Sequence, residues 1–391
     1  MATKLIDVTR FGEHFPVITE KGLQELKKRI GLKITKTLWQ WVTEATLDSI
    51  RHYAYGIGDD NPLWTDPDYA AKTRYGSIIA PPAFLYAANR IISGYVGGLP
   101  GVHAMFAGTD WTWYLPIHLG TKFEVEVYLK DLVEHETRFA GRAIQQIYHG
   151  DFYNQKGEKL AECNSWCFRT ERATAREKGE KYKKIKDRKV YTNDEIKKIK
   201  SLYQNEEVRG AKPRYWEDVK EGERLPTIVK GPMTITGFIA FAQGWGGLYI
   251  RAHKIAFKLY KDHPGVAIPN AYNIPDIPER VHWEDELAKA VGTPAAYDYG
   301  PERVSWMSHL MTNWIGDDGW LYKLNAKIVR HNPVGDTLNI SGKVTKKYQK
   351  DSQGYVECEL LAANQDGESS CEAQATVILP FKKAPRRSRS L

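Results

Sequence analysis

Two segments of the chain carry the residue types that general acid–base catalysis uses. The first contains the run Gly-Asp-Asp-Asn-Pro-Leu-Trp-Thr-Asp at residues 58–66, in which Asp59 and Asn61 are the polar candidates. The second lies between Pro278 and Trp306 and contains His282. Carboxylate and imidazole groups held beside a substrate move protons in many enzymes. Proton transfer is therefore the chemistry that both segments indicate.

The sequence offers no other familiar reaction centre. It contains no glycine-rich phosphate loop, no Gly-x-Ser-x-Gly nucleophile turn and no His/Cys spacing typical of a metal site. Cys163 and Cys167 stand four residues apart without a second pair, and we interpret them as buried free thiols. We therefore expect no metal and no redox cofactor.

The elements that must position these residues occur twice, which indicates a duplicated domain. Near-identical turns lie at residues 154–158 (NQKGE) and 364–368 (NQDGE), and alternating apolar residues before each turn predict antiparallel strands. Upstream of the strands, residues 83–96 and 302–316 each predict a helix, because proline stands where each helix would begin. Helix followed by strands is an α+β order.

The predicted boundaries follow from this repeat. We expect an N-terminal domain at 1–172, a charged linker at 173–204 with a short helix capped by Asn193 or Asp194, a C-terminal domain at 205–383 and a basic tail at 384–391. The net charge of +8 is concentrated in the linker and the tail, so it does not indicate nucleic-acid binding. No apolar run is long enough for a membrane span, and no secretory signal begins the chain. We expect a cytoplasmic protein.

Residues 53–85 resemble the MaoC-like, or (R)-specific enoyl-CoA hydratase, family of hot-dog proteins. That family carries Gly-Asp-x-Asn-Pro-Ile/Leu-His-x-Asp, then an alanine, and then His-Gly-Met at the start of the hot-dog helix. The resemblance covers the motif and following strands of the first half and the helix and strands of the second. It implies a tandem hot-dog fold, in which antiparallel sheets each wrap a central helix. It also implies reversible addition of water to a 2-enoyl-CoA, with coenzyme A as part of the substrate.

The first half departs from the family motif at two positions. Asp59 matches the catalytic aspartate of the family, and Asn61 matches its asparagine. Trp64 stands where the family has histidine, and Pro82 stands where a glycine amide would bind the thioester oxygen. Proline has no N–H to donate. The resemblance therefore implies that this half keeps its acid and lacks its base and oxyanion donor.

The second half departs in the opposite way. The interval from Trp64 to Pro82 equals that from His282 to Gly300, so this alignment puts His282 at the histidine position and Gly300 at the oxyanion-donor position. Ile277 then occupies the aspartate position. About 30 residues, at 248–277, interrupt this motif and contain a predicted helix. Asp276 and Glu279 are the candidate replacements for the missing carboxylate.

Binding of a CoA thioester should also need cations for its phosphates. Arg74, Arg280 and Arg303 lie near the two motifs, and with Asn61 they are the predicted substrate-binding residues. His309 and Asp317 are interpreted as packing and turn residues.

Three functions remain open. The leading hypothesis is a hydratase/dehydratase for a 2-enoyl-CoA or 3-hydroxyacyl-CoA, with a bulky acyl group and chemistry in the second half. The first alternative is a non-catalytic acyl-CoA-binding or scaffold subunit, working as a homodimer or with another hot-dog or thiolase-like subunit. The second is an acyl-CoA thioesterase, for which Glu302 is the candidate carboxylate.

Overall fold

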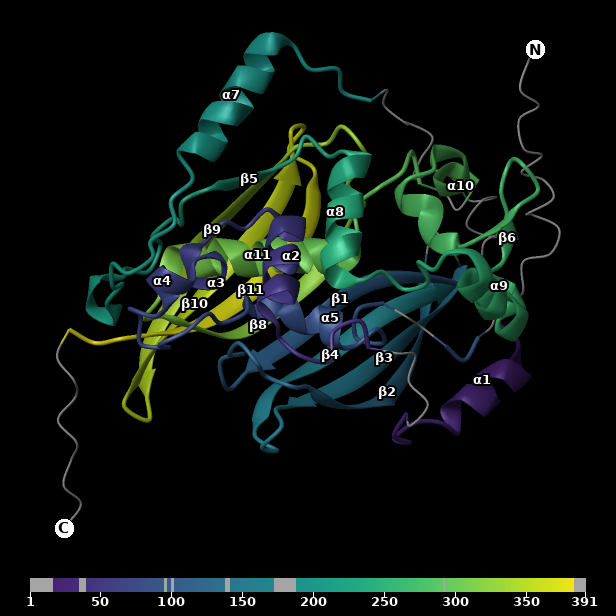
Figure 1. The fold of residues 1–391 in the computed structure, drawn as a ribbon, viewed down its shortest axis with the longest axis horizontal. Helices are drawn as coiled ribbons and strands as arrows, with labels where there is room; N and C mark the ends of the chain where they lie inside the picture. Colours follow the sequence, from purple (N-terminus) through teal and green to yellow (C-terminus); the bar gives the residue numbers. More distant parts are fainter. Residues whose placement is uncertain are drawn as a thin grey trace.

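One long antiparallel sheet is the framework of the molecule (Figure 1). The computed structural model describes residues 17–34, 40–94, 97–99, 102–137, 141–171, 188–290 and 293–382. The nine strands follow the order β2-β3-β4-β1-β8-β11-β10-β9-β5. Their bounds are β1 His103–Trp113, β2 Glu124–Thr137, β3 Gly141–Tyr153, β4 Lys159–Thr170, β5 Ile228–Lys230, β8 Trp320–Ile328, β9 Leu338–Lys350, β10 Gln353–Asn364 and β11 Ser369–Leu379. A separate ribbon pairs β6 Ile268–Pro269 with β7 Pro275–Asp276.

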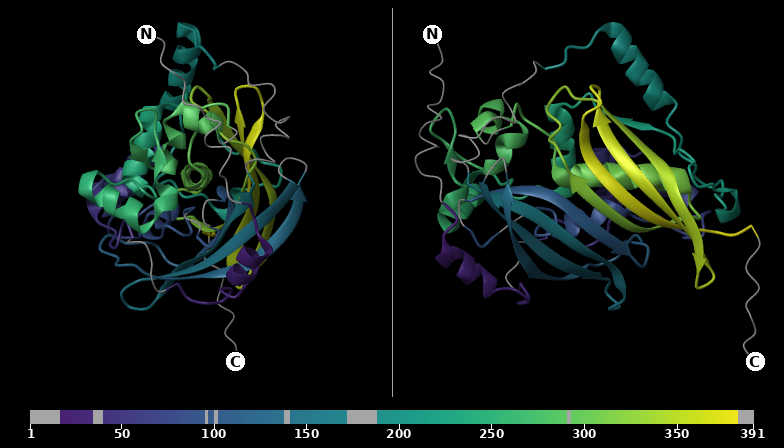
Figure 2. Two further views of the ribbon diagram at one scale, coloured as in Figure 1. Left: turned by 90° about the vertical axis from the view of Figure 1, so that its right-hand side faces the viewer. Right: turned by 180° about the vertical axis from the view of Figure 1, so that it is seen from behind.

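The helices gather on one face of this sheet and leave the other face open (Figure 2). The central helix of the second half, α11, lies against this face and is buried along nearly its whole length. The α-helix bounds are α1 Glu20–Lys27, α2 Leu47–Ile57, α3 Pro62–Thr65, α4 Pro67–Ala70, α5 Leu85–Ala88, α7 Asn193–Gln204, α8 Ile235–Trp245, α9 His253–Asp262, α10 Asp285–Ala290 and α11 Gly300–Ile315.

The two halves meet along the pairing of β1 with β8. The register runs from Gly108 opposite Lys327 to Thr112 opposite Lys323, and the Trp320 indole donates to the Trp113 carbonyl at 3.0 Å. The tandem hot-dog prediction is confirmed, with one addition. The two sheets do not stand apart but form one continuous sheet.

The predicted repeat is visible in matching turns. In the first half, Asn154 Oδ1 accepts from the amides of Lys156 and Glu158 at 2.9 and 3.0 Å. In the second half, Asn364 Oδ1 accepts from the amides two and four residues later at 3.1 and 2.9 Å. The same side chain therefore builds the same turn twice, because asparagine can bond its own backbone two residues on.

The helix predicted for residues 83–96 is much shorter than expected. A 3-10 turn at Pro82–Phe84 leads into α5, which ends at Ala88. Asn89 is extended, and its side-chain oxygen accepts from the amides of Ile91 and Ile92 at 2.9 and 3.2 Å. Because that side chain offers the next amides a partner outside a helix, the helix stops there.

Two further predictions concern the segments between the repeats. The linker helix exists as α7, but Thr192 caps it, in place of Asn193 or Asp194. Its hydroxyl and the Glu195 carboxylate form a reciprocal capping box. The insertion at 248–277 contains the predicted helix, α9. Residues 172–187 and 383–391, which include most of the predicted domain boundaries, lie outside the described residues, so these boundaries stay predictions.

Both ends of the sheet are blunted. The edge strand β5 is only three residues long. At the opposite edge, residues 30–34 run beside β2, where the Gly31 amide donates to Leu129 O and the Ile34 amide to Val127 O, each at 2.8 Å. Short or covered edges are typical of sheets that do not recruit another strand.

Two glycines at equivalent positions of the repeat allow α2 and α8 to touch. A Cβ on Gly56 would lie 3.0 Å from Ala240 O, and one on Gly244 would lie 2.5 Å from His52 O. Only hydrogen fits at either contact. The backbones of the two helices therefore approach each other directly, and this fixes how the halves are packed.

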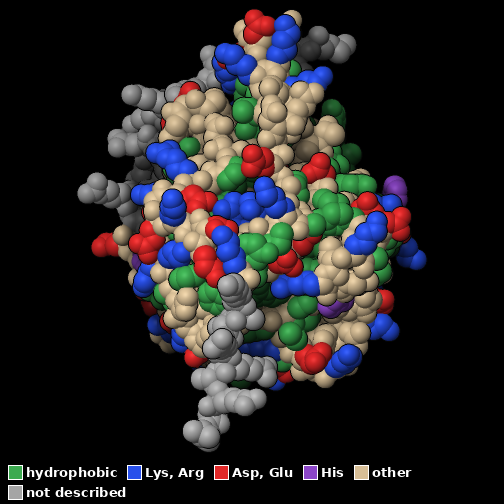
Figure 3. Space-filling view, turned by 90° about the vertical axis from the view of Figure 1, so that its left-hand side faces the viewer, with side chains coloured by type: hydrophobic (Ala, Val, Ile, Leu, Met, Phe, Trp, Pro, Cys, Tyr) green, Lys and Arg blue, Asp and Glu red, His purple; other side chains and the backbone are tan. Residues whose placement is uncertain are grey.

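Surface charge and helix composition add two observations. On the face seen in Figure 3, Lys and Arg side chains are interspersed with Asp and Glu, so neither sign of charge dominates that view. Within the residues that the structure describes, no helix is both long enough and apolar enough to cross a membrane.

We predict that Gly244→Ala lowers the free energy of unfolding by about 1–3 kcal/mol, since the new methyl group overpacks the α2–α8 contact. Urea unfolding followed by circular dichroism measures this. The matched control is Gly265→Ala, where a Cβ meets nothing within 4 Å, and a change below about 0.5 kcal/mol is expected. Equal stability of the two variants would contradict the close contact.

Candidate active site

His282 lies at the end of a short 3-10 turn, Pro278–His282, just before α10. Its Nδ1 is 2.7 Å from the carbonyl oxygen of Tyr297. The imidazole stacks on the ring of Tyr299 with centroids 3.7 Å apart, and the Tyr297 ring meets it edge-on at 4.8 Å. Tyr299 is the N-cap residue of α11. The ring is therefore held at the start of the central helix.

The surroundings of His282 keep its ring neutral. Desolvation lowers the pKa of His282 to about 3, and the bond to the Tyr297 carbonyl only partly opposes this. Because a carbonyl can only accept, a neutral ring must carry its proton on Nδ1. The lone pair then lies on Nε2. A neutral imidazole can accept a proton, although a pKa of about 3 makes it a weaker base than an exposed histidine.

Gly300 is the first residue of α11, where backbone amides have no partner within the helix. The positive end of the helix dipole adds to their attraction for a negative oxygen. The ring of Phe106 packs against this glycine, since a Cβ there would lie 2.4 Å from the ring. His282 and the Gly300 amide thus lie at one end of one helix, as the alignment of the two motifs predicted.

Glu279 has a structural role in this region. It is 4% exposed, and it accepts from the amides of Leu248 and Tyr249 at 2.8–3.0 Å. The guanidinium of Arg90 holds the carbonyl of Leu248 at 2.6 Å. Burial raises the pKa of Glu279, although the two amides lower it. These bonds anchor the beginning of the insertion, which speaks against Glu279 as the missing catalytic carboxylate.

Asp276 lies in the ribbon strand β7 and is only partly buried. It accepts from the Ile277 amide at 2.7 Å and lies 3.8 Å from the guanidinium of Arg280. Arg280 is itself 1% exposed and lies 3.3 Å from Glu284. Asp276 therefore belongs to the ion pairs that fold the insertion, and nothing in its contacts directs it toward His282.

Two of the three arginines predicted to bind phosphates are buried. Arg280 donates to Pro269 O as well as facing its acidic neighbours. Arg303 is 2% exposed and lies 2.8 Å from Asp298. Burial raises the pKa of Asp298 to about 6, although Arg303 and Asn332 lower it. This burial speaks against phosphate binding by either residue, and Arg303 would in addition have to leave the buried Asp298 unpaired.

The first motif forms a different arrangement, in which residues distant in sequence meet. Asp59 Oδ1 is 3.4 Å from His309 Nε2, and that nitrogen is 3.2 Å from Glu206 Oε1. The Asn61 amide donates to Asp59 at 3.1 Å, and the Asn61 side chain caps α3. Lys230 donates to Gly58 O at 2.8 Å. This buried ionic cluster ties the first motif to α11 and to the end of the linker.

The cluster brings the carboxylates of Asp59 and Glu206 together with His309 and Lys230. Burial lowers the pKa of Lys230, while the carboxylates of Glu206 and Asp59 raise it. Burial raises the pKa of Glu206, but His309, Lys230 and Asn313 together lower it and leave it below its ordinary value. Acidic and basic side chains are therefore buried next to one another. Such a group holds segments together, and removing one member leaves a buried charge unpaired.

Open space lies beside the first motif. An inner cavity of about 40 Å³ is lined by Trp64 and Pro82, the two departures from the family motif, and by the end of α11. An outer groove of about 660 Å³ adjoins it and shares Trp113 and Trp320 with it. Arg74 lines this groove, so it stays the predicted phosphate ligand. Neither His282 nor Gly300 lines the cavity or the groove.

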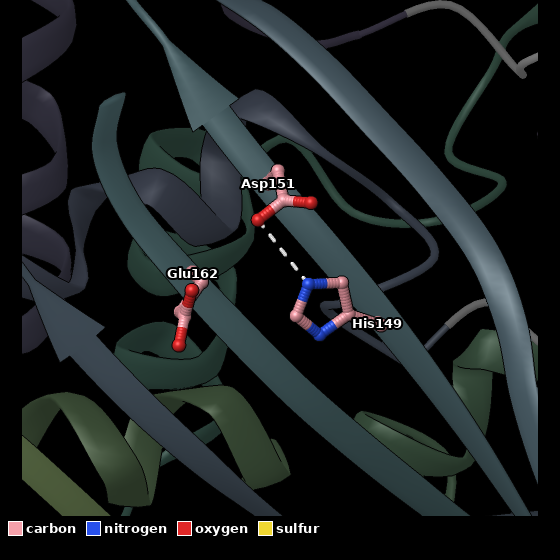
Figure 4. A group of neighbouring side chains, drawn as sticks. All are labelled: His149, Asp151 and Glu162. Carbon is pink, nitrogen blue, oxygen red and sulfur yellow. Dashed lines mark ion pairs between the residues drawn. The ribbon is translucent and has the colours of Figure 1, made fainter. Parts of the chain in front are cut away.

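One group of described side chains has the composition of a metal site: His149, Asp151 and Glu162 on β3 and β4 (Figure 4). His149 Nε2 lies 3.2 Å from Asp151. The ammonium of Lys159, however, lies 2.8 Å from Asp151 and 2.5 Å from Glu162. Both carboxylates thus already have a cation, and the carboxylates raise the pKa of Lys159 against the effect of burial.

Comparison with known proteins agrees with this architecture. Residues 30–163 match the family model described as FAS1-like, dehydratase domain region. A UPF0336 protein of Streptomyces avermitilis is 26% identical over 122 residues, covering 30% of this chain and 78% of its own. Another, from a Parafrankia species, is 29% identical over 136 residues, covering 33% of this chain and 83% of its own.

Solved structures extend the likeness to the whole chain. A MaoC-like dehydratase covers 91% of this chain and 99% of its own, at 16% identity and a TM-score of 0.62. A putative MaoC domain protein dehydratase from Chloroflexus aurantiacus covers 91% and 96%, at 11% identity and a TM-score of 0.58. A Mycobacterium tuberculosis protein described as a double hotdog fold covers 89% and 97%, at 9% identity and a TM-score of 0.54.

The chain has the double hot-dog fold of the MaoC-like dehydratases. Within this double hot-dog, the segment that matches the dehydratase family model is the half with Trp64 and Pro82. The residues that fit the family's base and oxyanion donor lie in the other half. The first repeat therefore carries the sequence similarity to the family model, and the second carries the candidate base and oxyanion donor.

Several residues of the double hot-dog were missed or misjudged in the sequence. His309 was interpreted as a packing residue, yet it pairs with Asp59. Asp317, taken for a turn residue, accepts from the Tyr69 hydroxyl at 2.6 Å. Asp298 does not belong to any motif recognised in the sequence. The one local signal is weak: it is an acidic residue just before a predicted helix whose beginning contains Arg303. The partners lie too far away in sequence for spacing to reveal them.

We predict that His282 makes the double hot-dog less stable in mild acid. The folded pKa of about 3 lies below the unfolded value near 6.5, so the unfolded chain takes up the proton first as the pH falls. Stability is then lost as the pH falls from about 6.5 toward 3, by about 1–2 kcal/mol between pH 7 and pH 5. Urea unfolding at both pH values measures this.

His282→Gln is the control, because all other titrating groups are unchanged in it. Its unfolding free energy should fall less than that of the unaltered chain over the same interval. An identical pH dependence in the two proteins would show that the imidazole is not desolvated.

Proposed function

We propose that this protein is a hydro-lyase that adds water to a 2-enoyl thioester, or removes it from a 3-hydroxyacyl thioester, in its C-terminal half. The observation that carries the proposal is the position of a neutral imidazole at the start of α11. His282 stacks on Tyr299 at 3.7 Å, directly before Gly300. This contact supports the pairing of His282 as base with the Gly300 amide as oxyanion donor.

The chemistry would divide between these two groups. In hydration, Nε2 of His282 accepts a proton from water while the oxygen of that water bonds to Cβ of the substrate. The thioester oxygen carries negative charge as the double bond shifts, and the Gly300 amide stabilises it. Cα then takes up the proton that Nε2 of His282 received from the water, which returns the imidazole to its neutral form, and the thioester carbonyl re-forms. One preset oxyanion donor contributes a few kcal/mol, roughly 3, to lowering such a barrier.

The substrate class rests on the likeness to MaoC-like dehydratases. Arg74 does not add to it, because this arginine lines the outer groove beside Gly319, after the C-terminal end of α11, whereas His282 and Gly300 lie at the start of that helix. Coenzyme A is the thioester carrier that we propose. The insertion is anchored by Glu279 beside His282, and its displacement would admit a bulky acyl group.

A second candidate function has its own support. The described cavity lies in the half whose motif carries Trp64 and Pro82, so a protein that binds acyl thioesters without turnover would use that half. Such a subunit would work with a second copy or with another hot-dog or thiolase-like chain. Thioester hydrolysis is less well supported, because Glu302 is fully buried and accepts from the Tyr299 amide at 3.2 Å.

We predict that the purified protein hydrates crotonyl-CoA or a longer 2-enoyl-CoA, and that His282→Ala lowers kcat by about 10²–10⁴-fold. Loss of enoyl absorbance measures the reaction, and a thiol reagent that detects free CoA separates hydration from hydrolysis. His263→Ala removes the exposed histidine that follows α9 and should keep full activity.

Asp59→Asn tests the choice of half. Its shape is preserved, and unfolding curves establish that the variant is folded. We expect at most a modest loss of activity. Full activity in His282→Ala together with loss of activity in folded Asp59→Asn would place the chemistry in the first half. Absence of turnover with every enoyl-CoA, together with co-purification of a second chain, would favour the binding function.

A further inference from the structure

Two tyrosines of the segment just before α11 contact the proposed base. Along an extended backbone, successive side chains point to opposite sides, and Tyr299 has extended dihedral angles. The rings of Tyr297 and Tyr299 both meet His282, with centroids 4.8 and 3.7 Å away. Asp298, between them, is directed instead to Arg303 at 2.8 Å. The segment therefore presents its aromatic rings to the imidazole and its charge to α11.

The backbone of this segment is itself fixed. Both carboxylate oxygens of Asp298 accept from Asn332, one from its backbone amide at 3.1 Å and one from its side-chain amide at 2.6 Å. The Asp298 amide donates back to Asn332 O at 3.1 Å, and Ala296 O accepts from the Val334 amide at 2.9 Å. Because these bonds hold the chain directly before Tyr299, the phenol ring starts from a defined position.

The ring of Tyr299 is also confined by its neighbours. The residue is 2% exposed, and its ring meets Trp245 edge-on at 5.0 Å and Phe241 at 5.5 Å, both on α8. Its hydroxyl lowers the pKa of Glu279, which lies on the same 3-10 turn as His282. The phenol is therefore held between α8 and the turn that carries the imidazole, against which it stacks.

The orientation of the imidazole decides whether it can act as a base at all. Desolvation holds the pKa of His282 at about 3, and the positive charge of Arg303 lowers it further. Nδ1 lies 2.7 Å from the Tyr297 carbonyl oxygen, and this bond leaves the lone pair on Nε2. A half-turn of the ring would exchange Nδ1 with a carbon and break the bond. A weak base depends on being held in the geometry of the reaction.

We infer that Tyr299 is a positioning residue for His282. Its ring fixes the plane of the imidazole, so that Nδ1 stays on the Tyr297 carbonyl and Nε2 keeps its lone pair at the start of α11. A side chain that only filled space could be any apolar group of similar size, whereas this role needs a flat ring. The effect of Tyr299 on turnover rests on the proposed function, but its effect on the orientation of His282 does not.

The test reads the tautomer of His282 at pH 7 from proton–nitrogen correlation spectra of the full chain with isotope-labelled histidine. The signals of this residue are those that disappear in His282→Gln. We expect only the Nδ1–H form in the unaltered chain. Tyr299→Leu keeps apolar bulk and loses the ring, so the Nε2–H form should become populated as the imidazole turns.

The same variants are assayed for hydration of a 2-enoyl-CoA. Tyr299→Leu should lower kcat by about 10–100-fold, because the base is misplaced, and should leave KM little changed. Tyr299→Phe keeps the stacking face, so it should restore both the single Nδ1–H tautomer and most of kcat.

Phe152→Leu is the matched control. It makes a similar substitution at a fully buried ring of β3, whose ring contact is with Trp111. It should lower stability and leave the tautomer and kcat unchanged. The inference is overturned if folded Tyr299→Leu keeps the single Nδ1–H form, or if Phe152→Leu alters the tautomer equally. If Tyr299→Leu does not fold, Tyr299→Met replaces it, because methionine fills irregular gaps.

Failure of the proposed function has a different signature. An unaltered chain that hydrates no enoyl-CoA would refute that function, while a changed tautomer in Tyr299→Leu would still establish that Tyr299 orients the imidazole. Hydration by the unaltered chain together with an unchanged tautomer in Tyr299→Leu would overturn only the role of Tyr299.

Discussion

The backbone pairing of β1 with β8 is the constraint on which both candidate sites depend. It fuses two four- or five-stranded sheets into one and so fixes the distance between the two central helices. Through it, the end of α11 reaches the first motif, where His309 meets Asp59. The Tyr53 hydroxyl, 2.9 Å from the Ser305 hydroxyl, adds a buried contact between the halves. Neither half could complete its surroundings alone.

Duplication followed by divergence explains why the two sites look so different. Each repeat has the same helix, motif and strands, yet His282 and Gly300 occur in one and Asp59 in the other. Burial then acts on each set separately. It lowers the pKa of the His282 imidazole, whereas in the other half Asp59 and His309 are buried 3.4 Å from each other. The different surroundings of the two repeats therefore give their related motifs different chemical properties.

The sequence carried enough information for the fold, and less for the site. Strand alternation and the asparagine turns are local signals, so the repeat and the tandem hot-dog could be predicted from them. The short first helix was missed because Asn89 offers the backbone an alternative that periodicity does not detect. The equal spacing in both motifs assigned His282 to the histidine position, and the ring lies against Tyr299 at the start of α11; its catalytic role stays a prediction.

The surroundings of the predicted carboxylates and arginines could not be derived from the sequence, for a physical reason. Whether Glu279 or Arg303 is free depends on partners folded against it, and these partners follow from tertiary packing. Glu279 binds two amides of the insertion and Arg303 faces Asp298. Charge alone does not distinguish a ligand-binding residue from one that is buried and compensated. Long-range pairs such as Tyr69 with Asp317 are equally invisible in the sequence.

The short or partly covered edge strands of the sheet limit how this molecule can assemble. At one rim only the three residues of β5 offer backbone groups, and at the other the segment at 30–34 already occupies part of β2. Extension of the nine strands into a second molecule is therefore unfavourable. Any higher-order assembly would have to form through side chains, on the sheet face that the helices leave uncovered or on the helices themselves. By joining its two repeats internally, the chain pairs one edge of each repeat with the other and leaves β5 and part of β2 as its outer edges.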